Sequence, residues 1–432
     1  MSDKSLIRKK SLELGEPIVE LLLKVINEPS YGTGWRATLL GICPVSQLTI
    51  RAAIESASLH DFPLMFVATL NQVDIDGGYT GLTPKDFVDL VRVESERVGF
   101  KGPTIICLDH GGPWLKDKHV VERLKLEEAL EQVEKSIEAC IKAGYDLLHI
   151  DATADIWLER NKTLDMDTIV ERTIDLIEYA EGVREKIHAP RVSYEVGTEE
   201  IYGGVTSPRS FKKFIVKLKE GLKNRGLEDV WPCFIVGNVG TFLAPTNRFN
   251  SNKARTLVKI AKSQGLYLKG HFTDYVSNPN EYPKAGIGAA NIGPELAHAE
   301  YRALEELAGL EMTFFRRGHV SQPSNIIEKL NEAVIRSGKW KKWLRAKEHA
   351  LEFHQLPQKR RNWLLGTGAR YFFSSSELVE AKTILRKNFE RYGIDAERVI
   401  IAKIRDVLWK YIHAFNLKDL TYEVNSRLLK QL

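Results

Sequence analysis

Eight short apolar runs recur between residues 39 and 294, and this repetition restricts the fold more than any other feature of the chain. Most of the runs are continuously apolar rather than alternating, which is typical of strands buried on both faces. The runs cover residues 39–45, 63–69, 103–110, 147–152, 191–197, 232–238, 267–274 and 286–294. Because helical segments separate them, the pattern predicts an α/β protein with a TIM-type (β/α)8 barrel.

The helical segments between the runs support this prediction. The longer ones are residues 84–98, 123–143, 166–187, 207–224 and 252–263. The first has a clear start signal, because Thr83 offers a capping hydroxyl, Pro84 suits the first helical position and Asp86 adds an acid. The seventh connection, residues 276–284, contains two prolines and leaves room for at most a short helix.

We divide the chain into three parts. These are an N-terminal helical segment, residues 1–35, the barrel, residues 36–309, and a C-terminal helical extension, residues 310–432. Residues 6–26 predict an amphipathic helix across the lower end of the barrel, and residues 325–355 and 376–415 predict helices without a strand between them. Since no flexible linker precedes the extension, we expect it to pack on the barrel.

Composition and charge exclude several classes of protein. No stretch of 18 or more apolar residues exists and the N-terminus lacks a signal-peptide pattern, so we expect a cytoplasmic enzyme without membrane contact. A net charge of +5, from 62 basic and 57 acidic residues, is too mild to predict a nucleic-acid partner. The basic, aromatic segment 339–345 is interpreted as a solvated helix face with a packing stripe.

Familiar cofactor motifs are missing from the sequence. The four cysteines show no CxxC spacing, which indicates small buried side chains rather than a zinc–thiolate site. The fragments at residues 32–37 and 286–288 do not make a dinucleotide-binding fingerprint, and no GxxxxGK[ST] loop is present. Nicotinamide chemistry and sugar-kinase activity are therefore not expected.

Polar side chains follow several of the predicted strands at their carboxyl ends, which a parallel barrel gathers around one mouth. His110, Glu199 and His271 end the third, fifth and seventh strands, and two imidazoles with a carboxylate suit zinc, manganese or nickel. We therefore predict a divalent metal site made of these three residues. Carboxylates beside them are candidates for proton transfer or for orienting the ligands, namely Asp109, Asp151 and Asp274.

Candidate substrate-binding groups lie in the loops after the strands. The polar, glycine-rich loop 71–81 offers Asn71, Gln72 and Tyr79, which suit recognition of a polyol. Asn238 and Asn291 end the sixth and eighth strands. Residues 291–295 open a helix where many barrels bind phosphate through free amides, although the same place could bind a neutral sugar hydroxyl.

These segments together resemble one known family. The matching motifs are Asn71-Gln72-Val, Gly77-Gly78-Tyr79-Thr80-Gly81-Leu-Thr83-Pro84, Asp109-His110-Gly-Gly112-Pro113, His149-Ile-Asp151-Ala152, Gly197-Thr198-Glu199, His271-Phe-Thr273-Asp274-Tyr275 and Gly293-Pro294, with weaker echoes near Arg370-Tyr371. They look like the signatures of the GatZ/KbaZ family, named for the Z subunit of class II tagatose-1,6-bisphosphate aldolase. The resemblance runs from about residue 40 to 295.

The resemblance implies two different roles. Some members are regarded as accessory subunits that stabilise a catalytic Y subunit, whereas others are described as metal-dependent 4-epimerases that interconvert fructose and tagatose. This chain departs from the enteric pattern in two places: Glu195 stands where an aliphatic residue is usual, and the first strand ends in Ser46-Gln47 without the enteric histidine. An added carboxylate facing the mouth favours a working site.

Chemical reasoning restricts the mechanism of such an epimerase. The hydrogen on C4 of a 2-ketohexose is not alpha to the carbonyl, so enolisation cannot invert that carbon. Cleavage and re-formation of the C3–C4 bond can, with a metal at the C2 carbonyl and carboxylates on two sides of the substrate. We expect Asp109 and Glu195 in these roles, with Asp151 or Asp274 as substitutes.

The leading hypothesis is therefore a homo-oligomeric, metal-dependent ketohexose 4-epimerase. The alternatives are the accessory subunit, partnered by a Y-type chain, and a true aldolase acting on a phosphorylated ketose.

Overall fold

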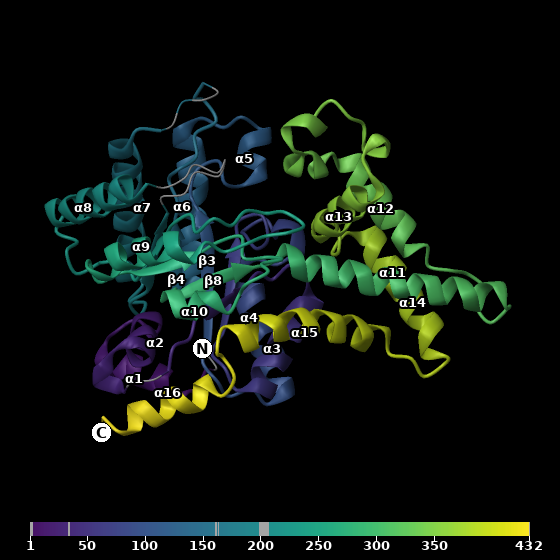
Figure 1. The fold of residues 1–432 in the computed structure, drawn as a ribbon, viewed down its shortest axis with the longest axis horizontal. Helices are drawn as coiled ribbons and strands as arrows, with labels where there is room; N and C mark the ends of the chain where they lie inside the picture. Colours follow the sequence, from purple (N-terminus) through teal and green to yellow (C-terminus); the bar gives the residue numbers. More distant parts are fainter. Residues whose placement is uncertain (1–2, 33–34, 160–161, 163, 198–206, 432) are drawn as a thin grey trace.

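The structure is a computed structural model that describes residues 3–32, 35–159, 162, 164–197 and 207–431 (Figure 1). Eight parallel strands form a closed barrel in the order β1 to β8, as predicted. The strands are β1 (Leu39–Ile42), β2 (Leu64–Thr69), β3 (Thr104–Gly111), β4 (Leu147–Ile150), β5 (Ser193–Gly197), β6 (Phe234–Val236), β7 (Tyr267–Gly270) and β8 (Ala289–Ile292). Pairing of Leu39 with Ala289 closes the barrel between β1 and β8.

Helices connect the strands and surround the barrel. They are α3 (Gln47–His60), α4 (Pro84–Val98), α5 (Asp117–Val121), α6 (Leu126–Ala143), α7 (Met166–Lys186), α8 (Pro208–Asn224), α9 (Ser251–Lys262), α10 (Glu281–Ala285) and α11 (Pro294–Arg316). The predicted start of α4 is confirmed, because Thr83 accepts a hydrogen bond from the Asp86 amide and Asp86 accepts one from the Thr83 amide. The seventh connection holds only the short α10, as predicted.

The N-terminal segment forms two helices, not one. They are α1 (Leu6–Leu14) and α2 (Ile18–Asn27), and Gly15, with a φ of 64°, ends the first. Arg8 on α1 donates to Asp146, which lies just before β4, so the segment is tied to the amino-terminal end of the barrel strands. The predicted location across the lower end of the barrel is confirmed.

The C-terminal region is helical, but its predicted helices are interrupted. Its elements are α12 (Ile326–Ser337), the 3-10 helices η3 (Lys339–Trp343), η4 (Ala346–Glu348) and η5 (Phe353–Gln355), α13 (Gln358–Gly368), the 3-10 helix η6 (Ala369–Tyr371), α14 (Ser376–Glu390), α15 (Ala396–Ala414) and α16 (Leu420–Leu429). The prediction of one helix over 325–355 is wrong, because Gly338 at a φ of 67° ends α12. The segment 376–415 likewise splits at a turn that contains Gly393, with a φ of 69°.

The C-terminal region packs on the barrel, as expected. Helix α15 runs back beside α11 and packs against α3, and α16 ends next to α1 and α2 (Figure 1). Main-chain hydrogen bonds join Thr38 to Phe415 and Asp419 to His60. Helix α11 crosses residue 310 without a break, so the proposed boundary at that position lies inside a helix. Within the described chain, none of the helices is long and apolar enough to span a membrane.

Candidate active site

Four metal-ligating side chains converge at the carboxyl ends of the barrel strands. Asp109 and His110 come from β3, His149 from β4 and His271 from the residue after β7. One ligand atom from each lies within 4.8 Å of the others, and all but His110 are buried. Imidazole nitrogens with a carboxylate oxygen are donors that zinc, manganese and nickel accept. These residues therefore fit a divalent cation, and we call them the donor cluster.

His110 is oriented by a neighbouring carboxylate. Its Nδ1 donates to Asp151 Oδ2 over 2.6 Å, and Asp151 Oδ1 accepts from the amide and hydroxyl of Thr153. Burial alone would lower the pKa of His110, but Asp109 and Asp151 raise it to about 9. A histidine held in this way presents its other ring nitrogen to a metal. Asp151 is absent from the cavity lining, so its placement indicates an orienting role.

His149 belongs to the donor cluster although sequence reasoning assigned it no role. Its Nδ1 lies 3.0 Å from Asp109 Oδ1, and its Nε2 has no hydrogen-bond partner among the described residues. A usable signal was present, because His149 and Asp151 are two positions apart and side chains two apart on a strand point to the same face. The other predicted ligand, Glu199, lies outside the described residues.

Glu195 is buried beneath the donor cluster. Its Oε2 accepts from Lys269 Nζ over 2.5 Å and its Oε1 lies 3.1 Å from His271 Nε2, with the Glu195 and Lys269 side chains both 0% exposed. Burial alone would raise the pKa of Glu195, but Lys269 and the histidines hold it below its usual range.

The expectation that Glu195 faces the mouth is wrong. The residue lies in the middle of β5, its contacts with Lys269 and His271 place its carboxylate in the barrel interior, and it does not line the cavity. Lys269 also escaped sequence reasoning, since a lysine in an apolar run carries no signal of its partner.

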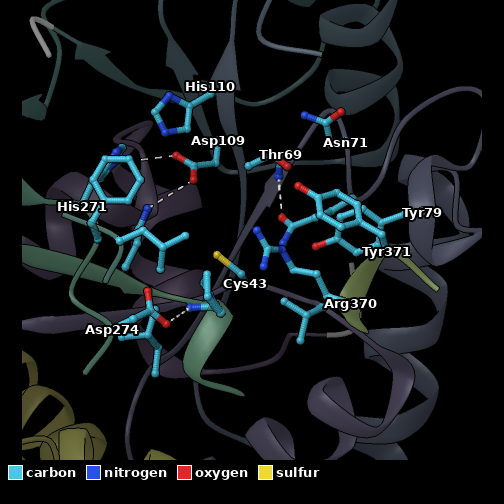
Figure 2. Close-up of a pocket in the computed structure, with 18 of the residues that line it drawn as sticks. Cys43, Thr69, Asn71, Tyr79, Asp109, His110, His271, Asp274, Arg370 and Tyr371 are labelled. Atoms are coloured by element: carbon cyan, nitrogen blue, oxygen red, sulfur yellow. Dashed lines mark hydrogen bonds and ion pairs between the residues drawn. The ribbon is translucent and has the colours of Figure 1, made fainter. Parts of the chain in front are cut away.

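A cavity of about 310 Å³ opens above the donor cluster (Figure 2). Asp109, His110 and His271 line it, as do the predicted substrate-binding residues Asn71, Gln72, Tyr79 and Asn291. Asn238 does not line the cavity, because its Oδ1 accepts from the Gly240 amide and from Lys253.

The predicted substrate-binding residues differ in how free they are. Both ends of the Asn71 amide are engaged by the backbone of Leu115 and Asp117, so Asn71 shapes the wall. Asn291 instead donates to Asp109 Oδ2 over 3.4 Å, and its Oδ1 has no partner among the residues described.

Asp274 lines the cavity at the start of α11. Its Oδ1 accepts from the amides of Gly293 and Glu295, over 2.9 and 2.7 Å. Burial raises the pKa of Asp274 to about 7. We expected the amides at the start of α11 to bind a phosphate or a sugar hydroxyl. Two of them instead donate to the carboxylate of Asp274.

The C-terminal region supplies another wall of the cavity. Lys342 and Trp343 from η3, and Arg370 and Tyr371 from η6, line it together with Tyr79. Lys341 and Lys342 are exposed while Trp340 and Trp343 pack on the core, which agrees with the predicted solvated face and packing stripe. The part that Lys342 and Trp343 take in lining the cavity was not predicted. The basic and aromatic composition of that segment does not reveal that Lys339 and Lys342 contact Asp117, 222 and 225 residues earlier in the chain.

Solved structures share this architecture. The chain is similar to a probable tagatose 6 phosphate kinase from Sinorhizobium meliloti 1021, with a TM-score of 0.70, 24% identity and coverage of 87% of this chain and 100% of that one. It is also similar to a fructose-bisphosphate aldolase from Campylobacter jejuni, with a TM-score of 0.53, 11% identity and coverage of 89% and 90%. At these identities the likeness shows the fold alone.

The sequence carries more specific information about ancestry than the fold does. The match to a family profile covers residues 24–416, a span that includes the donor cluster, the cavity and most of the C-terminal region. The chain belongs to the family of D-tagatose-1,6-bisphosphate aldolase subunit GatZ/KbaZ-like proteins, the family that its motifs resemble.

Proposed function

We propose that the chain is a metal-dependent ketohexose 4-epimerase that interconverts D-fructose and D-tagatose by cleaving and re-forming the C3–C4 bond. The observation that carries the proposal is the convergence of Asp109, His110, His149 and His271 beside a cavity of about 310 Å³. A cavity of this size suits one hexose, since pockets for small ligands begin at about 300 Å³. Membership of an aldolase-related family agrees with chemistry at a carbon–carbon bond.

The histidines His110, His149 and His271 would hold the cation, with the cavity-lining Asp109 next to it. A divalent cation there would polarise the C2 carbonyl and stabilise the negative charge that develops when the C3–C4 bond breaks. Asp151 fixes the ring of His110, and Glu195 fixes that of His271. The buried Lys269 balances the charge of Glu195.

Proton transfer requires groups that reach the substrate from two sides. Asp109 and Asp274 both line the cavity, whereas Glu195 and Asp151 do not, so we assign the two transfers to Asp109 and Asp274. One carboxylate takes the proton of the C4 hydroxyl as the bond breaks. After the aldehyde half rotates, the other returns a proton on the opposite face. With its pKa near 7, Asp274 can serve as acid or base at neutral pH.

The test is conversion of fructose by purified protein loaded with zinc, manganese or nickel. We expect tagatose to appear in the NMR spectrum, and the chelated protein to produce none. Fructose deuterated at C4 should react without a primary isotope effect, because the C4–H bond stays intact. Failure of every loaded form to convert fructose refutes the proposal, and a primary isotope effect refutes the cleavage route.

The family description favours a second candidate, an accessory subunit of a tagatose-bisphosphate aldolase. It requires a catalytic partner chain, whereas we propose a self-sufficient homo-oligomer. Size measurement of the purified chain, with and without a Y-type subunit, separates the two. Aldolase activity on a phosphorylated ketose is a third possibility, and a coupled triose-phosphate assay detects it.

A further inference from the structure

Arg370 reaches the cavity from the side opposite the donor cluster. In Figure 2 its guanidinium lies with Tyr79 and Tyr371, whereas Asp109, His110 and His271 stand across the cavity. The side chain leaves η6 and lies beside two rings, with its Cζ 4.7 Å from the ring centre of Trp343 and 4.8 Å from that of Tyr371. A planar cation packed against aromatic rings is kept in one orientation.

Arg370 is 8% exposed and, among the described residues, forms no direct ion pair with a carboxylate. The nearby Asp274, which lines the same cavity, interacts with its charge without a direct contact. Of the five N–H groups of a guanidinium, one nitrogen donates to the carbonyl oxygen of Thr367. No other hydrogen bond of the guanidinium to a described residue is found, and the residue lines the cavity. A buried cation that no carboxylate contacts directly is costly, so an anionic ligand would stabilise this arrangement.

The neighbouring lysines add positive charge on the same side of the cavity as Arg370. Lys342 and Lys339 both contact Asp117, over 2.5 and 3.0 Å, so two positive charges share one carboxylate. This wall of the cavity therefore carries a net positive charge. The amides at the start of α11 are not available for an anion, because Asp274 occupies two of them. Arg370 is thus the anion-binding group left open on this wall.

We infer that Arg370 is a specificity-determining residue that binds an anionic group at the end of the substrate remote from the donor cluster. The preferred substrate is then a ketose with a terminal carboxylate or phosphate, since the guanidinium fork matches two oxygens of either group. Neutral hexoses become slower substrates of the same site. The inference rests on the proposed function only in treating this cavity as the substrate site.

The test uses open-chain polyols that cannot react, so that binding is measured independently of any activity. Glucitol, gluconate and glucitol 6-phosphate are six-carbon polyols that carry, respectively, no anionic group, a terminal carboxylate and a terminal phosphate. We expect calorimetry on the zinc-loaded protein to give a dissociation constant for one of the anions at least about tenfold below that of glucitol. Comparison of the two anions tells whether the site is suited to carboxylate or phosphate. Equal constants for all three overturn the inference.

Variants show whether Arg370 causes the preference. Arg370→Met should abolish it, while an unchanged thermal unfolding midpoint and unchanged zinc binding verify that the variant is folded. Arg370→Lys should keep part of the anion preference. The control is Lys341→Met, which removes an exposed positive charge from the C-terminal region and should keep the whole preference. Because a carboxylate or phosphate could also bind the metal directly, a preference that persists in Arg370→Met overturns the inference.

The outcome is separable from that of the epimerase assay. If the wild-type protein converts fructose but shows no anion preference, only the role of Arg370 is refuted. A preference that depends on Arg370, without fructose conversion, supports the anion site and refutes the neutral hexose as substrate.

Discussion

Replacing Lys269 by methionine tests whether the charges inside the barrel depend on each other. The Lys269 Nζ to Glu195 Oε2 distance is 2.5 Å and both side chains are 0% exposed, so the substitution leaves a carboxylate in an apolar interior. Breaking a buried pair by removing one partner costs about 3–5 kcal/mol. Glu195 keeps a contact with His271, 3.1 Å away, so we expect the low end of this range, a fall of about 3 kcal/mol in the free energy of unfolding.

The double variant separates lost packing from unpaired charge. Lys269→Met with Glu195→Gln removes both charges, while the glutamine can still hydrogen-bond His271. We expect it to lie about 1–2 kcal/mol below the wild type, closer to it than either single variant. The control is Lys135→Met, which breaks an exposed pair with Glu131, 2.6 Å apart, and should change stability little.

Urea unfolding followed by tryptophan fluorescence measures these differences, with chelated and zinc-loaded protein compared. A cation in the donor cluster would partly replace the charge of Lys269, so zinc should reduce the deficit of Lys269→Met. Simple additivity of the two single substitutions would refute the reasoning. A loss of under about 1 kcal/mol in Lys269→Met would refute it too.

Three further predictions follow from local features. Asp151→Asn should weaken zinc binding by about 10–100-fold in a chelator competition, because His110 loses its orienting carboxylate; unchanged affinity would contradict that role. Thr83→Ala should lower the unfolding free energy by about 1 kcal/mol in urea, through loss of the α4 cap, and no change would contradict the capping contribution. Burial raises the pKa of Glu20 from 4.5 to about 7. Between these two pH values the folded state keeps a proton that the unfolded state has lost, so the free energy of unfolding falls as the pH rises across this range. Glu20→Gln should remove that fall, and identical pH profiles of the two proteins would speak against it.

Local features made much of the fold predictable. The strands follow from continuous apolar runs, and α4 follows from the Thr83, Pro84 and Asp86 start signal. The helix predicted over 325–355 was wrong, because hydrophobic periodicity does not show that Gly338 adopts a left-handed conformation and ends α12. Propensity alone therefore overestimates helix length where a glycine permits a turn.

The candidate site was predictable in its chemistry but not in its depth or completeness. Strand ends marked Asp109, His110 and His271, and these do converge. Glu195 was misplaced because parity along a strand decides which face a side chain takes, whereas its level in the barrel depends on how the strands are staggered. Arg370 could not be placed, since its position depends on packing between distant parts of the chain.

The two walls of the cavity come from different parts of the chain. The barrel contributes the donor cluster, in which buried carboxylates and a lysine fix the histidines. The C-terminal region contributes Arg370, held by aromatic rings on short 3-10 segments rather than by a strand. Because η3 and η6 can change without disturbing a barrel strand, relatives could keep the donor cluster and still select different substrates. Substitutions at Arg370 should therefore alter which ketose binds, whereas substitutions at His149 or Lys269 should alter metal binding and stability together.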